Sequence, residues 1–103
     1  MYNIFLNSKL SINKWENYFS IYEFYLKNFI GKSPVMLEIG VQYGGSLRMF
    51  QQYLVNASLI GIDINPDCKK LQGENIKIRI GSQNDKSFLL NFADEFKSID
   101  IIL

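Results

Sequence analysis

Three short segments hold residues whose types and spacing suit the binding of a nucleoside-bearing cofactor. They are the glycine-rich segment Glu38–Ser46, the acidic residue Asp63, and the small and polar run that begins at Gly81. Glycines at a strand-to-helix turn let the backbone approach a ligand closely, and the amino end of the following helix favours a negative group. An aspartate after the next strand can accept the hydroxyls of a ribose, and hydroxyl or amide groups can line an adenine pocket.

Each segment is weak evidence by itself. Gln42 stands where the GxGxxG pattern of dinucleotide-binding folds requires its second glycine, and glycines in such turns often serve the backbone alone. Asp63 taken alone is equally consistent with a helix cap or a turn residue. A cofactor is favoured because the three segments occur in this order, each directly after a predicted strand, where ligands bind in open parallel sheets.

The segments that position these residues alternate between strand and helix patterns. Strands are predicted at 35–40, 58–63, 76–80 and 99–103, with helices between them at 46–54, 66–71 and 86–96, the last capped by Asp85. The third strand alternates apolar and charged residues, which favours an edge strand with one wet face. The expected fold class is therefore α/β: a Rossmann-like, partial doubly wound parallel sheet of strand order 3-2-1-4, preceded by an N-terminal helix.

Apolar residues at helical spacing predict which helix faces point inward. They are Leu47, Phe50 and Leu54 in the first of these helices and Phe88, Leu89, Phe92 and Phe96 in the last. The N-terminal helix begins with a capping box, Asn13 with Glu16, and Gly31 ends it. Its apolar stripe consists of Trp15, Tyr18, Phe19, Tyr22, Tyr25, Leu26 and Phe29. We interpret this stripe as core packing, with a lid or partner surface as the alternative, and divide the chain into segments 1–31 and 32–103.

Composition excludes several classes of function. The 103 residues are 48% hydrophobic and 20% charged, as in a globular domain, and a net charge of +1 without a dense basic cluster argues against nucleic acid. The absence of histidine removes any triad built on that residue. The single cysteine, Cys68, and the lack of a secretory signal favour a cytoplasmic protein, and no apolar run approaches the roughly 18 residues that span a bilayer.

The wider pattern resembles the class I S-adenosylmethionine-dependent methyltransferases. Leu37-Glu38-Ile39-Gly40 followed by Gly44 is similar to their first motif, Gly61-Ile62-Asp63 to the second, and Ile80-Gly81-Ser82-Gln83 to the third. Lys14-Trp15 and the segment 18–23, together with 37–47 and 61–66, resemble the macrolide-sugar O-methyltransferases of macrocin and mycinamicin type and their cephalosporin hydroxylase-like relatives. The resemblance covers roughly residues 14–103.

This resemblance implies S-adenosylmethionine as cofactor and, in the full-length protein, a transferase that methylates a hydroxyl of a sugar or another small molecule. The implied cofactor site consists of Glu38, Gly40, Gln42, Tyr43, Gly44, Gly45, Ser46, Asp63, Ile64, Gly81, Ser82 and Gln83. The loop would hold the methionine part, and Glu38 would reach its amino group through the loop or water. Asp63 would take the ribose hydroxyls, and Ser82, which replaces an aspartate common in the family, would lie with Gln83 beside the adenine.

The resemblance also implies that these residues form an N-terminal fragment. Relatives hold magnesium through an acidic motif directly after the fourth strand, where Leu103 stands last, so we assign no catalytic or metal-binding residue and expect no methyl transfer by these residues alone. We also expect Ile99, Ile101, Ile102 and Leu103 to form an apolar edge that favours self-association. The alternatives are a non-catalytic nucleoside-binding module or remnant, and a nicotinamide-binding domain, against which Gln42 argues.

Overall fold

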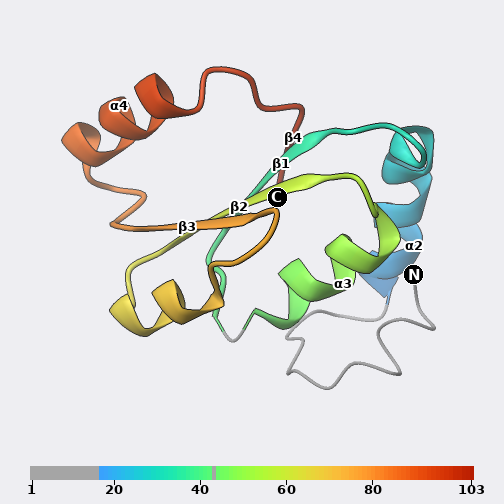
Figure 1. The fold of residues 1–103 in the computed structure, drawn as a ribbon, viewed down its shortest axis with the longest axis horizontal. Coiled ribbons are helices and arrows are strands. Elements are labelled where there is room, and N and C mark those ends of the chain that lie inside the picture. Colours follow the sequence, from blue (N-terminus) through green and yellow to red (C-terminus); the bar gives the residue numbers. More distant parts are fainter. Residues whose placement is uncertain (1–16, 43) are drawn as a thin grey trace.

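The computed structural model describes residues 17–42 and 44–103, and it arranges four strands in one sheet with helices on both faces (Figure 1). The elements are α2 (Asn17–Leu26), η1 (Lys27–Phe29), β1 (Val35–Ile39), α3 (Gly45–Tyr53), β2 (Ser58–Asp63), η2 (Pro66–Leu71), β3 (Ile76–Ile80), α4 (Lys86–Glu95) and β4 (Ile101–Ile102), where η marks a 3₁₀ helix. The predicted cap Asn13, together with Trp15, Glu16 and Tyr43, lies outside the described residues.

The strands form a parallel sheet of order β3-β2-β1-β4. β1 pairs with β2 from Val35–Ser58 to Ile39–Ile62, and β2 pairs with β3 along five residue pairs. This confirms the predicted order 3-2-1-4 and the edge position of β3. None of the helices in the described ranges has the length and apolar character that a membrane crossing requires.

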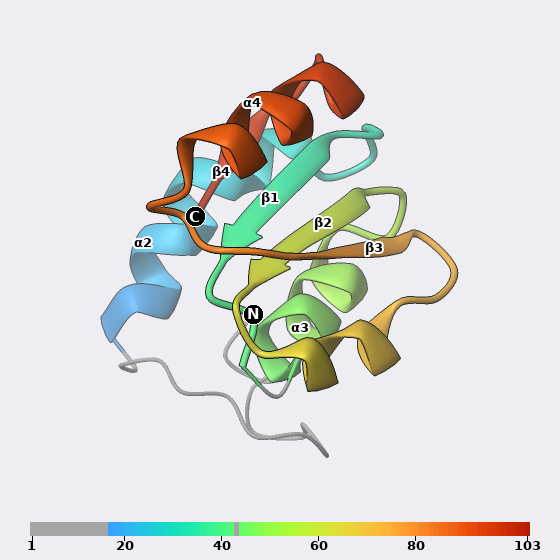
Figure 2. The same cartoon turned by 90° about the vertical axis from the view of Figure 1, so that its left-hand side faces the viewer.

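The sheet is buried on both faces, which explains why β1 and β2 are continuous apolar runs. One face packs against α2, α3 and η2, where Leu47, Phe50 and Leu54 of the predicted inner face are fully buried. The other face packs against α4 through a cluster of Leu37, Ile60, Ile62 and Phe92. Figure 2 shows α4 and α3 on opposite sides of the strands.

Among the described side chains that were predicted to face inward, Tyr25 and Leu89 do not. Tyr25 is 67% exposed, whereas Tyr22 and Leu26 pack into the core and the Tyr22 ring meets Phe50 edge-on at 5.6 Å. Successive residues of an α-helix are rotated by about 100° around the helix axis, and the strip of α2 that packs on the core is narrow. Tyr25 therefore lies beside this strip and faces solvent. Leu89 is 36% exposed because it lies at the flank of the strip that carries Phe88 and Phe92 into the core.

Local signals fix the ends of the helices. Asp85 accepts a hydrogen bond from the backbone N–H of Phe88 at 3.2 Å, as predicted for the N-cap of α4. Asn65 caps η2 in the same way by accepting from the Asp67 N–H at 3.0 Å. The N-terminal helix is α-helical only to Leu26 and continues as the 3₁₀ turn η1 before Gly31, whose φ is +82°.

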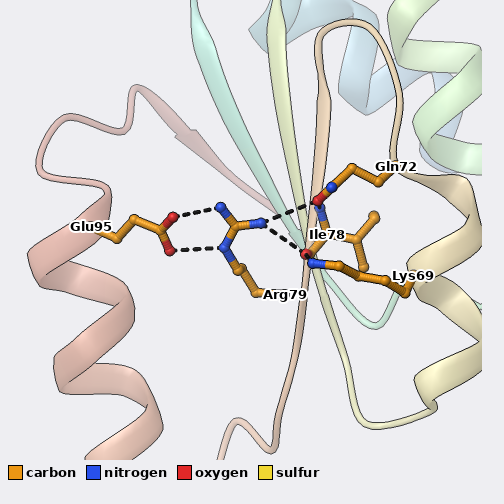
Figure 3. Close-up of polar contacts among 5 residues, drawn as sticks. All are labelled: Lys69, Gln72, Ile78, Arg79 and Glu95. Carbon is orange, nitrogen blue, oxygen red and sulfur yellow. Dashed lines mark hydrogen bonds and ion pairs between the residues drawn. The ribbon is translucent and has the colours of Figure 1, made fainter.

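The outer edge of β3 is covered by side chains instead of another strand. At Ile78 the backbone N–H donates to the Gln72 side-chain oxygen at 3.0 Å, and the carbonyl accepts from Lys69 Nζ at 2.8 Å (Figure 3). Arg79 extends this network to α4 by pairing its guanidinium with the Glu95 carboxylate. Because an edge strand with unpaired backbone groups invites pairing with other chains, these contacts protect this edge of the sheet.

β4 is shorter than the strand predicted from 99–103, and only part of it is exposed. Ile99 packs against the cluster beneath α4, while Ile101 and Leu103 contact the core on the opposite face. Of the four residues expected to form an apolar edge, only Ile102 is largely exposed, at 63%. The expectation failed for the other three because the segment is packed between the two layers of helices.

Gly61 in the middle of β2 gives the first testable prediction. A Cβ at this position would lie 2.5 Å from Val41 Cγ2 and 2.9 Å from Ile78 Cδ1, both in the packed core. We expect Gly61→Ala to lower the free energy of unfolding by about 1–3 kcal/mol, as overpacking does in well-packed cores. Gly73→Ala is the matched control, because a Cβ there meets nothing within 4 Å. Urea unfolding measures both, and equal stability of the two variants would contradict the prediction.

Candidate functional site

The three predicted segments meet at the carboxyl ends of β1, β2 and β3. The Gly40 N–H donates to the Ile62 carbonyl at 2.8 Å, and the Gly81 N–H donates to the Asp63 carbonyl at 3.0 Å. Each loop therefore leaves the sheet while still bonded to the neighbouring strand. Open parallel sheets bind ligands at this edge, so the geometry brings the candidate residues to the expected place.

The loop between β1 and α3 is wound through left-handed backbone conformations. Gly40 and Gly44 both have φ of +84°, and Gln42 has φ of +55°. Glycine adopts this region freely, but a residue with a Cβ there costs roughly 1 kcal/mol or more. Gly44 is also held close to η2, because a Cβ on it would lie 2.7 Å from Leu71 Cδ1. The conformation at Gln42 must therefore be stabilised by contacts elsewhere.

The carboxylate of Asp63 provides those contacts. Its Oδ2 accepts hydrogen bonds from the backbone N–H groups of Val41 at 2.9 Å and Gln42 at 3.0 Å, and its Oδ1 accepts from the Asn65 N–H at 2.9 Å. Burial by itself would raise the pKa of Asp63, but the bonds from Asn65, Gln42 and Val41 and from the Cys68 thiol outweigh it. The pKa of this carboxyl is therefore lower than its ordinary value.

Cys68 is a contact residue that the sequence did not reveal. Its buried thiol donates to the Gln42 carbonyl at 3.2 Å. Burial raises the pKa of the thiol, and the neighbouring charge of Asp63 raises it further, so Cys68 stays protonated and able to donate. Its burial could be expected from its residue type, but its contact with a backbone carbonyl has no signature in the sequence.

The residues at the base of the loop are buried. Glu38 in β1 is 3% exposed, and Gly45 and Ser46 in the first turn of α3 are buried too. Gly44 is the N-cap of α3 and makes no side-chain capping bond. A ligand at this turn would meet the backbone, and the indirect contact of Glu38 with a ligand stays a prediction.

On the other side of Asp63 the surface is mixed. Ile64 is 72% exposed directly after β2, and Gln83 is exposed after β3. The Ser82 hydroxyl accepts from the Asn84 N–H at 3.1 Å, so it stabilises its own turn. Gly81 lies against the Phe88 ring, where a Cβ would come within 2.3 Å. Ile64 and Gln83 are therefore exposed to solvent beside Asp63, while Gly81 and Ser82 contribute to the fold.

A hollow of about 500 Å³ lies at the opposite end of the sheet. It is lined by the first residues of β1 and β2, Val35 and Ser58, and by Lys97 and Ser98 before β4. Because the predicted ligand residues follow the carboxyl ends of the strands, this hollow does not belong to the candidate site. Within residues 17–42 and 44–103, no three His, Cys, Asp or Glu side chains gather as a metal site would require.

Comparisons with known proteins agree with this geometry, although no family model matches the chain. The chain is 28% identical over 96 residues to the 8-demethyl-8-(2-methoxy-alpha-L-rhamnosyl)-tetracenomycin-C 3'-O-methyltransferase of Streptomyces olivaceus. It is 29% identical over 100 residues to the 8-demethyl-8-alpha-L-rhamnosyl tetracenomycin-C 2'-O-methyltransferase of the same organism. These matches cover 86% and 88% of this chain but 24% and 26% of the relatives, so the chain spans about a quarter of their length.

A solved structure gives the same result. The MycE methyltransferase from the mycinamycin biosynthetic pathway, in complex with Mg, SAH and mycinamycin VI, superposes with a TM-score of 0.75 at 29% identity. The match covers 84% of this chain and 24% of that one. A second crystal form of MycE with Mg and SAH gives a TM-score of 0.69 over 75% of this chain and 21% of that one.

The sheet order and the glycine turn followed by an acidic strand end make the fold Rossmann-like, and this fold is similar to that of the MycE methyltransferase. The chain is similar to the S-adenosylmethionine-dependent O-methyltransferases that act on sugars. The resemblance that the sequence indicates is thus confirmed, and the similarity extends over most of the described residues.

The lowered pKa of Asp63 predicts a specific dependence of stability on pH. A carboxyl whose pKa is lower in the folded than in the unfolded protein stabilises the fold above the unfolded value, here 3.8. That contribution is lost as the pH falls through the lower, folded value. We expect Asp63→Asn to be less stable than the wild type at neutral pH and to lose less stability between about pH 5 and pH 3. Urea unfolding across this range measures the difference, and parallel profiles of the two proteins would contradict it.

Proposed function

We propose that this chain forms the S-adenosylmethionine-binding half of a methyltransferase, and that the full-length protein methylates a hydroxyl of a sugar or another small molecule. The observation that carries the proposal is the left-handed loop at Gly40–Gly44, joined to the acidic end of β2 by Asp63. The similarity to two rhamnosyl O-methyltransferases and to the SAH-bound MycE supports it. The description of the methyl acceptor as a hydroxyl of a sugar or another small molecule rests on that similarity alone.

The proposed site uses the loop for the methionine part of the cofactor. A Cβ on Gly40 would meet no atom within 4 Å, so the space beside this turn is open to a ligand. Gln42, Gly44, Gly45 and Ser46 would continue this wall, with Glu38 buried beneath it. Tyr43, which lies outside the described residues, is assigned to the site from the sequence alone. The amino end of α3 directs backbone N–H groups toward the ligand and favours its carboxylate.

The second half of the proposed site receives the nucleoside. Asp63 would accept a ribose hydroxyl, and the exposed side chain of Ile64 would pack on the adenine ring. Gly81, Ser82 and Gln83 would border the adenine from the end of β3. When bound, the cofactor supplies a methyl group on a positively charged sulfur. The residues of this chain bind and orient it, and we assign none of them to proton transfer or to the acceptor.

We also propose a cytoplasmic location, a division into segment 1–31 and cofactor domain 32–103, and association of two copies through β4. The location rests on the single cysteine. The association rests on Ile102, whose exposed side chain lies on an edge strand. Sedimentation of the wild type beside Ile102→Lys tests it, since a wild type that sediments as a monomer would contradict association.

Two glycines with the same backbone conformation provide a matched test of the cofactor site. Gly44 has φ of +84° in the loop, and Gly31 has φ of +82° before the amino end of β1, at the other end of this strand from the site. Both alanine variants carry the same backbone strain, but only Gly44→Ala also pushes Leu71 away from the loop. We expect calorimetric titration with SAH to show saturable binding that weakens about tenfold or more in Gly44→Ala and is unchanged in Gly31→Ala.

The titration has two outcomes that count against the proposal. One is no saturable binding by wild-type protein whose circular dichroism shows it to be folded. The other is an equal loss of affinity in both glycine variants, which would mean that strain anywhere in the chain, and not the shape of this loop, governs binding.

A further inference from the structure

The backbone of the cofactor loop is held by groups that follow β2. The N–H groups of Val41 and Gln42 both point to one oxygen of Asp63, at 2.9 and 3.0 Å. The carbonyl of Gln42 accepts from the Cys68 thiol at 3.2 Å. Both polar backbone groups of Gln42 are thus bonded to residues 21 or more positions later in the chain.

This arrangement explains how a non-glycine residue adopts the conformation found at Gln42. Two successive N–H groups converge on one point only when the chain turns sharply, as it does with φ of +55° at Gln42. A carboxylate oxygen suits that point because it accepts two bonds and carries negative charge. A neutral side chain at position 63 would satisfy fewer of these donors and leave the turn without its anchor.

The carboxylate has little capacity left for a ligand. Its two oxygens offer about four acceptor positions. Three are occupied by the N–H groups of Val41, Gln42 and Asn65. The Cys68 thiol also interacts with this carboxylate, so any ribose hydroxyl that donates to Asp63 shares it with donors of the protein. Most of what Asp63 binds is therefore the protein itself.

We propose that Asp63 is a positioning residue for the cofactor loop: its carboxylate holds Val41 and Gln42 in the binding shape before the cofactor arrives, in addition to its contact with the ribose. The proposal rests on the proposed function for the identity of the ligand. Binding to a preformed loop avoids the entropic cost of ordering it, so loss of this anchor weakens every ligand that touches the loop.

The test separates the two roles by removing the hydroxyls from the ligand. SAH and its 2',3'-dideoxy analogue are titrated calorimetrically into the wild type and Asp63→Asn. The carboxamide keeps the size of the side chain, but its NH₂ group faces a backbone N–H donor in either orientation. We expect the variant to bind the dideoxy analogue about tenfold more weakly than the wild type does, because the loop is no longer held. If the two proteins bind the analogue equally, Asp63 acts through the ribose alone and the proposal is wrong.

Asp100→Asn is the matched control. Asp100 also accepts a backbone N–H, that of Val35 at 2.8 Å, but at the amino end of β1 and away from the loop. The control shows what the loss of such a bond does to binding in general, and we expect it to leave the affinity for both ligands unchanged. A loss of affinity for the analogue in Asp100→Asn as large as that in Asp63→Asn would also overturn the proposal.

Amide hydrogen exchange without ligand keeps the proposal testable if the proposed function fails. Should neither ligand bind the wild type, the Val41 and Gln42 amides still report on the loop. We expect them to be protected in the wild type and in Asp100→Asn and to exchange at least tenfold faster in Asp63→Asn, while the amides of β2 keep their protection. Unprotected loop amides in the wild type would overturn the proposal independently of any cofactor.

Discussion

The hydrogen bonds between the Asp63 carboxylate and the loop after β1 are the interaction on which the candidate site depends. They join the carboxyl ends of two neighbouring strands, so the register of β1 and β2 also sets the position of the loop. The buried residues on both faces of the sheet keep these strand ends in place. The loop is thus fixed by the Asp63 carboxylate together with the packing of Val41 in the core and the bond from the Cys68 thiol to Gln42.

The sequence predicted the fold well because its elements are encoded locally. The strands at 58–63 and 76–80 match β2 and β3 in their bounds, and the cap at Asp85 is where its pattern placed it. The predictions for Tyr25 and Leu89 were wrong because helical spacing identifies the apolar face of a helix but not how much of that face the neighbouring elements bury. The length of β4 likewise depends on its pairing with β1.

The site could be predicted in position but not in detail. Strand ends, glycines and helix caps are visible in a sequence, whereas hydrogen bonds between distant segments, such as those from Val41 and Gln42 to Asp63, leave no residue pattern. Gln42 illustrates the difference: its side chain breaks the dinucleotide pattern, yet the backbone adopts the left-handed turn because its polar groups are bonded. The similarity to sugar O-methyltransferases supports the proposed kind of cofactor, and the geometry shows how the loop after β1 is held.

The side chains that cover Ile78 have a consequence for how the sheet can be extended. Lys69 and Gln72 occupy the outward backbone groups of β3 at Ile78, and the guanidinium of Arg79 fastens the same edge to α4. A new strand arriving there would first have to displace these bonds. At the opposite side, no such side-chain cover of β4 is found within residues 17–42 and 44–103, and Ile102 is exposed on this short strand. A further strand, whichever polypeptide supplies it, would therefore add to the sheet more easily beside β4 than beside β3.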